Sequence, residues 1–216
     1  MSSAYGVIAR PSAAVDLSTI LPVHASLRDK TPVLVDRVDK ATVDAASLEQ
    51  MRELLNHEIR DGKTYPQETE LDPEAFAAYF LSYDAFAARD AAGGELLGCF
   101  YIKPNFPGRC SHICNAGFLT MPAHRNRGVG RALATAFLRL APALGYRASM
   151  FNLVFESNEA SVRLWRSFGF REIGRVPEAG RLKVGPGGSE VWVDAIQFYY
   201  DFIEGEQGGV DAAQGR

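Results

Sequence analysis

P-A-H-R-N-R-G-V-G-R-A-L, at residues 122–133, has the composition of a loop that binds an anion. An apolar run at residues 112–121 precedes it and predicts a strand, and the spacing of apolar residues over 129–144 predicts a helix. Gly128 and Gly130 let the backbone turn closely around a ligand without a Cβ. The first N–H groups of the helix favour a phosphate at this point. The stretch therefore predicts a strand, a phosphate-binding turn and a helix in succession.

The charge around this turn differs from that of the whole chain. Arg125, Arg127 and Arg131 add positive charge from both sides of the turn, whereas the 216 residues together carry a formal net charge of −3. A mildly acidic protein offers no general surface for a polyanion, so we expect no nucleic-acid partner. A small phosphorylated ligand fits the local charge better.

Composition indicates a globular protein outside the membrane. The apolar fraction is 47%, which is enough for a sizeable core. The start of the chain does not resemble a secretory signal, and no apolar run has the length of a membrane span, so we expect a cytoplasmic protein. Three cysteines predict no disulfide framework. The C-x-H-x-C pattern of Cys110, His112 and Cys114 lacks a fourth ligand, so we expect no metal.

Outward from the turn, the hydrophobic pattern predicts seven strands and four helices. The strands are expected at 31–38, 85–89, 95–102, 112–121, 149–155, 170–175 and 191–200, and the helices at 44–60, from 72 onward, at 129–144 and at 158–168. This order predicts an α+β fold in which helices flank a mixed sheet. We expect residues 1–30 to form an N-terminal extension, 31–203 the domain, and 204–216 a disordered tail.

A second motif lies beyond the turn. N-E-A-S-V-R-L-W-R-S-F-G-F occupies residues 158–170. Together with Arg125, Gly128 and Gly130, it resembles the paired signatures of the Gcn5-related N-acetyltransferases (GNAT), and the resemblance covers residues 31–202. It implies the GNAT fold, with a seven-stranded mixed sheet that opens between its fourth and fifth strands. It also implies that acetyl-CoA is the co-substrate and binds in this opening.

The resemblance assigns cofactor-binding residues by position. The backbone of Phe118, Leu119 and Thr120 would pair with the pantetheine arm, and a main-chain N–H near Leu119 would polarise the thioester carbonyl. The backbone of the turn would hold the pyrophosphate. The turn residues are Arg125, Asn126, Arg127, Gly128, Val129, Gly130 and Arg131. Asn158 would contact the cofactor arm, or it would only cap its own helix.

One residue departs from the family pattern. Trp165 stands where many members have a tyrosine that protonates the departing thiolate. An indole N–H donates a hydrogen bond but is not a useful acid. We expect Trp165 to pack in the core or against the cofactor arm.

Two further stretches resemble a narrower group. N-F-P-G-R-C-S-H-I-C-N-A-G-F-L at 105–119 and L-G-Y-R-A-S-M-F-N-L-V-F-E-S-N at 144–158 are similar to the fungal acetyltransferases that detoxify L-azetidine-2-carboxylate, a proline analogue. This resemblance implies a homodimer and a small amino acid as acceptor, and the wider family resemblance implies direct transfer in a ternary complex. The fungal resemblance places the catalytic and substrate-binding roles on Asn115 and Asn152. Phe118 could line a small apolar pocket for a ring substrate.

The residue types support such roles and also allow a simpler interpretation. Asparagine is unfavourable in strands and costly to bury without partners, yet Asn115 and Asn152 lie within apolar strands. An amide offers both donors and acceptors, so the pair could align an amine for attack. Alternatively, both could satisfy backbone groups where the strands part, and Phe118 could be an ordinary core residue.

The acceptor is the least constrained part of this interpretation. A polyamine, a peptide N-terminus or a drug amine would fit the same donor site. A non-catalytic module that senses coenzyme A is an alternative from a different functional class.

Overall fold

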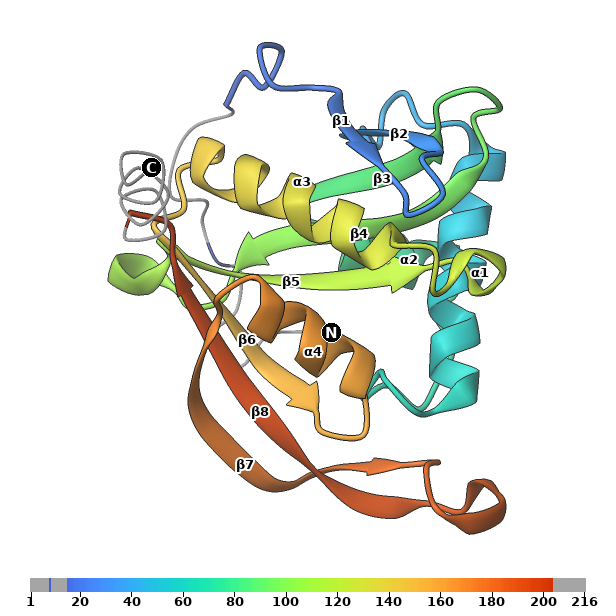
Figure 1. Cartoon of the computed structure of the whole chain (residues 1–216), viewed down its shortest axis with the longest axis vertical. Helices are drawn as coiled ribbons and strands as arrows, with labels where there is room; N and C mark the ends of the chain where they lie inside the picture. The colour runs from blue at the N-terminus through green and yellow to red at the C-terminus, as the bar shows by residue number, and fades with distance from the viewer. Residues whose placement is uncertain (1–7, 9–14, 204–216) are drawn as a thin grey trace.

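The computed structural model describes residue 8 and residues 15–203, and within them eight strands form one mixed sheet (Figure 1). The strands are β1 (Val23–Ser26), β2 (Pro32–Arg37), β3 (Asp84–Asp90), β4 (Leu96–Pro104), β5 (Ile113–Thr120), β6 (Ala148–Phe155), β7 (Arg171–Leu182) and β8 (Val191–Asp201). The helices are α1 (Ala45–Asp61), α2 (Pro73–Phe80), α3 (Val129–Ala143) and α4 (Glu159–Ser167). The predicted class, a mixed sheet flanked by helices, is confirmed.

The sheet opens between β5 and β6. Its strand order is β1-β2-β3-β4-β5-β6-β8-β7, and the β5–β6 pair is parallel while the other neighbours are antiparallel. β5 pairs with β6 only at Ile113 and Cys114, but it pairs with β4 from Cys114 as far as Thr120. Figure 1 shows the two strands diverging beyond this start. The predicted opening between the strands at 112–121 and 149–155 is therefore confirmed.

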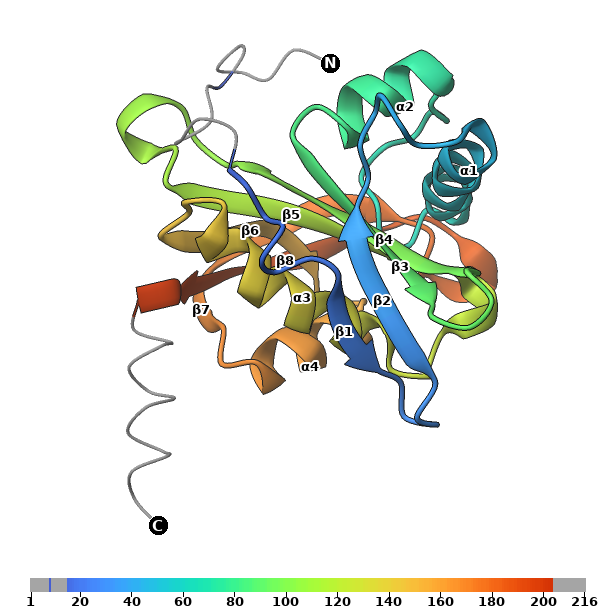
Figure 2. The ribbon, with the colours of Figure 1, turned by 90° about the horizontal axis from the view of Figure 1, so that it is seen from above.

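A separate hydrophobic cluster packs against each face of the sheet. α3 and α4 cover one face, where Phe137 of α3 packs near Phe100 of β4. α1 and α2 cover the other face, where Phe80 of α2 lies edge-on to Tyr101 of β4. Figure 2 shows the two helix pairs on opposite sides of the sheet. Neighbouring residues of β4 thus serve opposite faces, as the period of a strand requires.

The local signals in the sequence place most helix ends. Asp44, Asp72 and Asn158 accept hydrogen bonds from the third residue after them and cap α1, α2 and α4. Gly62 ends α1 in the left-handed conformation with φ of 65°. None of the helices in residues 15–203 combines the length and the apolarity of a bilayer span.

The structure corrects the strand count from seven to eight. The additional strand, β1, comes from residues assigned above to an N-terminal extension, and it pairs along β2 from Val23 to Ser26. Its four residues, V-H-A-S, are too few to show an alternating pattern in the sequence. Leu17 and Leu27 on either side of it belong to the cluster under α3. The predicted disordered tail, 204–216, lies outside the described residues.

β7 is also longer than predicted. Residues 170–175 were expected, but the strand continues to Leu182 despite Pro177 in its middle. The register between β7 and β8 shifts between Val176 and Gly180, so the proline lies in an irregular stretch where no ladder hydrogen bond is required of it. A proline inside a run signals a strand end in sequence, which explains the short prediction.

Candidate active site

The turn between β5 and α3 leaves backbone N–H groups without side-chain partners. Asn126 and Gly128 have positive φ, 62° and 100°, which is the backbone geometry of an anion-binding nest. α3 then begins at Val129, and its N-cap, Gly128, provides no side chain to accept from the first amides. The other three helices each begin with a capping side chain. The start of α3 therefore keeps its positive dipole end available for an anion.

The two glycines of the turn are required for different reasons. At Gly128 the left-handed φ is strained for any other residue, and a Cβ would lie 3.3 Å from Cγ of Arg28. At Gly130 the φ is ordinary, and a Cβ would meet only Cδ2 of Leu164, at 3.6 Å. Gly128 thus shapes the turn, whereas Gly130 lies toward α4 and keeps that space free of a side chain.

Two of the three predicted arginines are bound to carboxylates of this chain. Arg125 bonds to Glu58 of α1. Arg127 contacts Asp29 at 2.8 Å and also donates to Nδ1 of the buried His124 at 2.9 Å. These contacts attach the turn to α1 and to the segment between β1 and β2. The side chains of Arg125 and Arg127 therefore stabilise the turn, and their charge is largely compensated within the protein.

Arg131 is placed differently. Its guanidinium donates to Oγ of Ser167 at 3.2 Å and lies 4.9 Å from the ring centroid of Phe168. Both residues belong to the end of α4, so Arg131 spans the space between α3 and α4. It has no carboxylate partner among the described residues, so its charge is available to a phosphate in this space.

Beyond its pairing with β6, β5 has a neighbouring strand on one side only. From Asn115 to Thr120 it pairs with β4, and no strand of the described chain pairs with its other edge. Such an edge presents unpaired backbone groups that an extended ligand can bind like an added strand. Phe118, Leu119 and Thr120 lie in this part of β5, as the resemblance requires of a pantetheine-binding segment.

Phe118 and the two asparagines are not brought together. The ring of Phe118 points to the α3 and α4 face, where its centroid lies 5.3 Å from that of Phe100 and 4.9 Å from that of Trp165. Asn115, three residues earlier in the strand, faces the opposite side. Phe118 therefore packs in the aromatic core, and the structure gives no contact between it and Asn152.

Asn152 is held by a partner that the sequence analysis missed. Its Nδ2 donates to Oδ1 of Asn105 at 2.7 Å, and Nδ2 of Asn105 donates back to Oδ1 of Asn152 at 2.8 Å. Each amide still has one N–H and one lone pair left after this exchange. Asn105 follows the last residue of β4, so the pair joins β4 to β6 across β5. The pairing fixes the orientation of Asn152 before any ligand binds.

Asn115 lies between these strands and keeps its donors free. Its Oδ1 accepts from the N–H of Ala116 at 2.8 Å. No residue of the described chain accepts from its Nδ2, and the side chain is half-buried. Asn115 thus offers two N–H donors beside the opening of the sheet.

Trp165 and Asn158 have structural contacts of their own. Trp165 is 3% exposed, its Nε1 donates to Oγ of Ser161 at 3.0 Å, and its ring packs against Phe151 and Phe170. The expected packing of Trp165 in the core is confirmed, and α4 offers no acid at this position. Oδ1 of Asn158 caps α4 by accepting from the N–H of Ser161 at 3.2 Å.

The cysteine and histidine pattern does not converge. Cys110 is exposed while Cys114 is buried, and Nδ1 of His112 lies 3.1 Å from the carbonyl oxygen of Arg109. Burial raises the pKa of the Cys114 thiol to about 12. Within the described residues no three His, Cys, Asp or Glu side chains come close enough to hold a metal ion.

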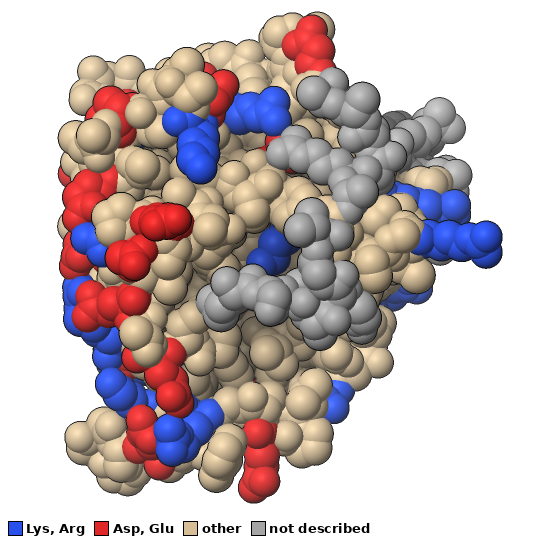
Figure 3. Space-filling view, turned by 180° about the vertical axis from the view of Figure 1, so that it is seen from behind, with Lys and Arg blue, Asp and Glu red and all other residues tan. Residues whose placement is uncertain are grey.

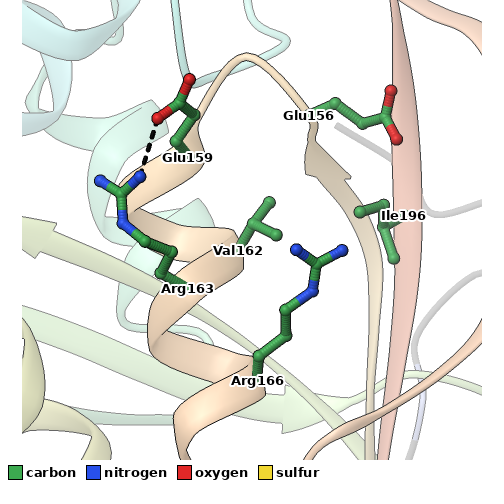
Figure 4. Close-up of a pocket in the computed structure, with 6 residues that line it drawn as sticks. All are labelled: Glu156, Glu159, Val162, Arg163, Arg166 and Ile196. Carbon is green, nitrogen blue, oxygen red and sulfur yellow. Dashed lines mark hydrogen bonds and ion pairs between the residues drawn. The ribbon is translucent and has the colours of Figure 1, made fainter.

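The charged side chains that line a surface hollow beside α4 are all in ion pairs, so we assign no separate binding site to it. It is lined by Glu156, Glu159, Val162, Arg163, Arg166 and Ile196 (Figure 4). The charged members all have partners: Glu159 pairs with Arg163, Arg166 with Glu172, and Glu156 with Arg175. Glu156, the carboxylate that follows β6, is therefore held in an ion pair and is not a free base.

Comparisons with known proteins agree with the fold and the turn. The model of the Acetyltransferase (GNAT) family matches residues 48–170. The N-acetyltransferase aca1 of Schizosaccharomyces pombe is 38% identical over 203 residues, which are 87% of this chain and 95% of that protein.

Solved structures are similar over most of the chain. A GCN5-related N-acetyltransferase from Kribbella flavida has a TM-score of 0.69 and 31% identity, and the match covers 78% of this chain and 97% of that one. A phosphinothricin acetyltransferase from Sinorhizobium meliloti, in complex with AcCoA, has a TM-score of 0.65 and 21% identity over 77% of this chain and 88% of that one. At that identity the second likeness concerns the fold alone.

Proposed function

The chain belongs to the acetyltransferase (GNAT) family, and we propose that it transfers the acetyl group of acetyl-CoA to the amine of a small amino acid. The proposed acceptor is a proline analogue such as L-azetidine-2-carboxylate. The observation that carries the proposal is the reciprocal amide pair of Asn105 and Asn152, which joins β4 to β6 across β5, the strand that carries Asn115.

The donor would lie on the side of the sheet that α3 and α4 cover. The backbone N–H groups of residues 126–131 would hold the pyrophosphate, supported by the uncapped start of α3 and by Arg131. The free edge of β5 at Phe118, Leu119 and Thr120 would pair with the pantetheine arm. A main-chain N–H near Leu119 would polarise the thioester carbonyl, and Asn158 would contact the arm from the start of α4.

The acceptor would lie on the side of the asparagines. Asn152, oriented by Asn105, and Asn115, with its free Nδ2, would fix the acceptor so that the nitrogen lone pair faces the thioester carbon. The amine nitrogen forms the new C–N bond, the C–S bond breaks, coenzyme A leaves as a thiol or thiolate, and the amine gives up a proton. An amide is no strong base, so water or the acceptor's own carboxylate would take that proton. Transfer is direct, without an acyl-enzyme.

Two finer parts of the proposal follow from the fungal resemblance: detoxification of a proline analogue, and a homodimer. Action in the cytoplasm is proposed from the sequence pattern alone. The dimer is supported by large apolar side chains at the surface of β7 and β8. Trp192 is 62% exposed and Ile173 is 51% exposed, and apolar surface of this kind is commonly covered by a partner.

A thiol-release assay tests the proposal directly. The purified protein is incubated with acetyl-CoA and L-azetidine-2-carboxylate, and free coenzyme A is followed with a thiol reagent. We expect steady release with the amino acid and little with spermidine or a peptide N-terminus. Release only with the polyamine or peptide would contradict the amino-acid assignment. Tight acetyl-CoA binding without release for any amine would favour the coenzyme A sensor.

A further inference from the structure

Lys103 is a half-buried cation on the acceptor side of the sheet. It lies on β4, and in the β4–β5 register it is directly opposite Asn115. Directly opposed residues of antiparallel strands have Cα atoms about 4.5–5.5 Å apart and project to the same face. Asn105, the partner of Asn152, follows two residues later. Lys103 therefore belongs to the same polar area as the three asparagines.

Within the described chain, two aromatic rings rather than a carboxylate lie against the ammonium group. Nζ of Lys103 lies 4.8 Å from the ring centroid of Tyr79 and 4.8 Å from that of Tyr101. The two phenol oxygens are 3.0 Å apart, and Tyr101 lies over Gly117, where a Cβ would be 2.6 Å from its ring. The rings are thus fixed against each other and against β5, and they hold the ammonium in place by cation–π attraction.

The buried carboxylate on this side of the sheet is committed elsewhere. Glu58, the buried carboxylate of α1, is bonded to Arg125 and to Oγ1 of Thr64. Lys103 has no ion pair with any described residue, whereas Arg37, Arg52 and Arg60 all do. In Figure 3, which shows the molecule from behind, acidic and basic side chains lie together along one edge of the face.

An unpaired ammonium in such a place is costly without a counterion. Burial lowers the pKa of Lys103, because the charged form has lost part of its hydration. Two ring faces offset only part of that loss, and a carboxylate would offset much more through a charge-assisted hydrogen bond. A bound anion at this point would therefore complete the surroundings of Lys103.

An α-amino acid has the dimensions to supply that anion. Its carboxylate is one carbon away from its amine, so the amine at Asn115 and Asn152 would place the carboxylate within reach of the neighbouring strand. On this basis, and resting on the proposed function, we propose that Lys103 binds the carboxylate of the acceptor and restricts the site to amines that carry one. The same charge repels polyamines and other cationic acceptors.

The test compares two acceptors of similar shape, of which one carries a carboxylate and the other a neutral carboxamide. Rates are measured with L-azetidine-2-carboxylate and with L-azetidine-2-carboxamide for the native enzyme, Lys103→Met and Lys103→Arg. Lys63→Met is the control, because Lys63 is exposed and pairs with Asp61. Circular dichroism and acetyl-CoA affinity confirm that each variant is folded.

We expect Lys103→Met to raise the KM for the carboxylate at least about tenfold while changing the KM for the carboxamide less than about twofold. The preference of the native enzyme for the acid would then be lost, Lys103→Arg would retain part of it, and Lys63→Met would retain all of it.

Three different results would contradict the inference, and each leads to a different conclusion. If the native enzyme acetylates the acid and Lys103→Met keeps the preference for it, this inference is wrong and the proposed function stands. If Lys103→Met and Lys103→Arg both lose kcat while the KM for the acid is unchanged, Lys103 moves a proton and does not bind the carboxylate. If the native enzyme prefers the carboxamide or a polyamine, both the inference and the amino-acid assignment are wrong.

Discussion

The two sides of the open sheet recognise their ligands in different ways. On the side of α3 and α4, the proposed donor site consists mainly of backbone: an uncapped helix start, two positive-φ residues and the free edge of β5. On the side of α1 and α2, the proposed acceptor site consists of side chains from three strands. The backbone site depends on conformation, and the side-chain site depends on residue identity.

This difference determines which substitutions matter on each side. A backbone site tolerates changes of side chain as long as the turn keeps its shape, so its weak point is Gly128. A side-chain site fails when a single amide is removed, although the fold is kept. Substitutions on one side of the sheet should therefore weaken the binding or use of one substrate and leave that of the other unchanged.

The largest effect is expected for Gly128→Val. A β-branched residue at φ of 100° is strained by about 1–3 kcal/mol and would press on Arg28, so the turn would change shape. We expect acetyl-CoA affinity, measured by calorimetry, to fall about 100-fold. Gly93→Val is the matched control, since a Cβ at Gly93 meets nothing within 4 Å. Unchanged affinity in Gly128→Val would show that the turn does not hold the donor.

A smaller effect, confined to the acceptor, is expected for Asn115→Ala and Asn152→Ala. Each removes hydrogen bonds worth about 1–2 kcal/mol to the reacting molecule, so kcat/KM for the amino acid should fall about 5- to 30-fold. The dissociation constant of acetyl-CoA should change less than about twofold. Normal kcat/KM in both variants would remove the asparagines from the site.

Asn105→Ala tests whether Asn105 acts through Asn152. The variant leaves Asn152 present but unheld, so we expect kcat/KM to fall about tenfold. In a double-mutant cycle, Asn105→Ala should add little once Asn152 is alanine, because the two amides act as one unit. Additive losses would show that Asn105 acts independently.

The arginines of the turn provide the smallest expected effect. Arg131→Ala should weaken acetyl-CoA binding about three- to tenfold, because the charge of Arg131 has no carboxylate partner in the described chain. This loss of affinity should be smaller at high salt, which screens the attraction between Arg131 and the phosphates. Arg127→Ala should change the affinity for acetyl-CoA less than about twofold, because the charge of Arg127 is already paired with Asp29. It should lower the melting temperature slightly, because the contacts of Arg127 with Asp29 and His124 are lost. Equal losses of affinity in the two variants would contradict this division.

The sequence predicted the local features well and the long-range ones poorly. The caps at Asp44, Asp72 and Asn158 and the glycine turn are properties of neighbouring residues, so the helices and the proposed donor site are visible in the sequence. β1 was missed because four residues carry no period, and the strand depends on the edge that β2 offers. The predicted range of β7 was too short because Pro177 was taken to lie beyond the end of the strand.

The acceptor side was predicted only in part for a similar reason. Asn115 and Asn152 were identified as asparagines in apolar strands and by resemblance. Asn105 follows a strand end, where a polar residue is ordinary, and Lys103 looks like a common lysine near the end of a strand. Only the pairing of β4 with β5, and the bridge from Asn105 to Asn152, shows that these residues lie together.

A crystal structure of the protein with coenzyme A and L-azetidine-2-carboxylate would show which side of the sheet each ligand occupies. We expect the pyrophosphate to lie on the amides of residues 126–131 and the amino acid to lie on the opposite side of the sheet. Its amine would be within hydrogen-bond distance of Asn115 or Asn152, and its carboxylate within that distance of Nζ of Lys103. An amino acid bound on the side of α3 and α4, or away from all three side chains, would rule out the proposed acceptor site.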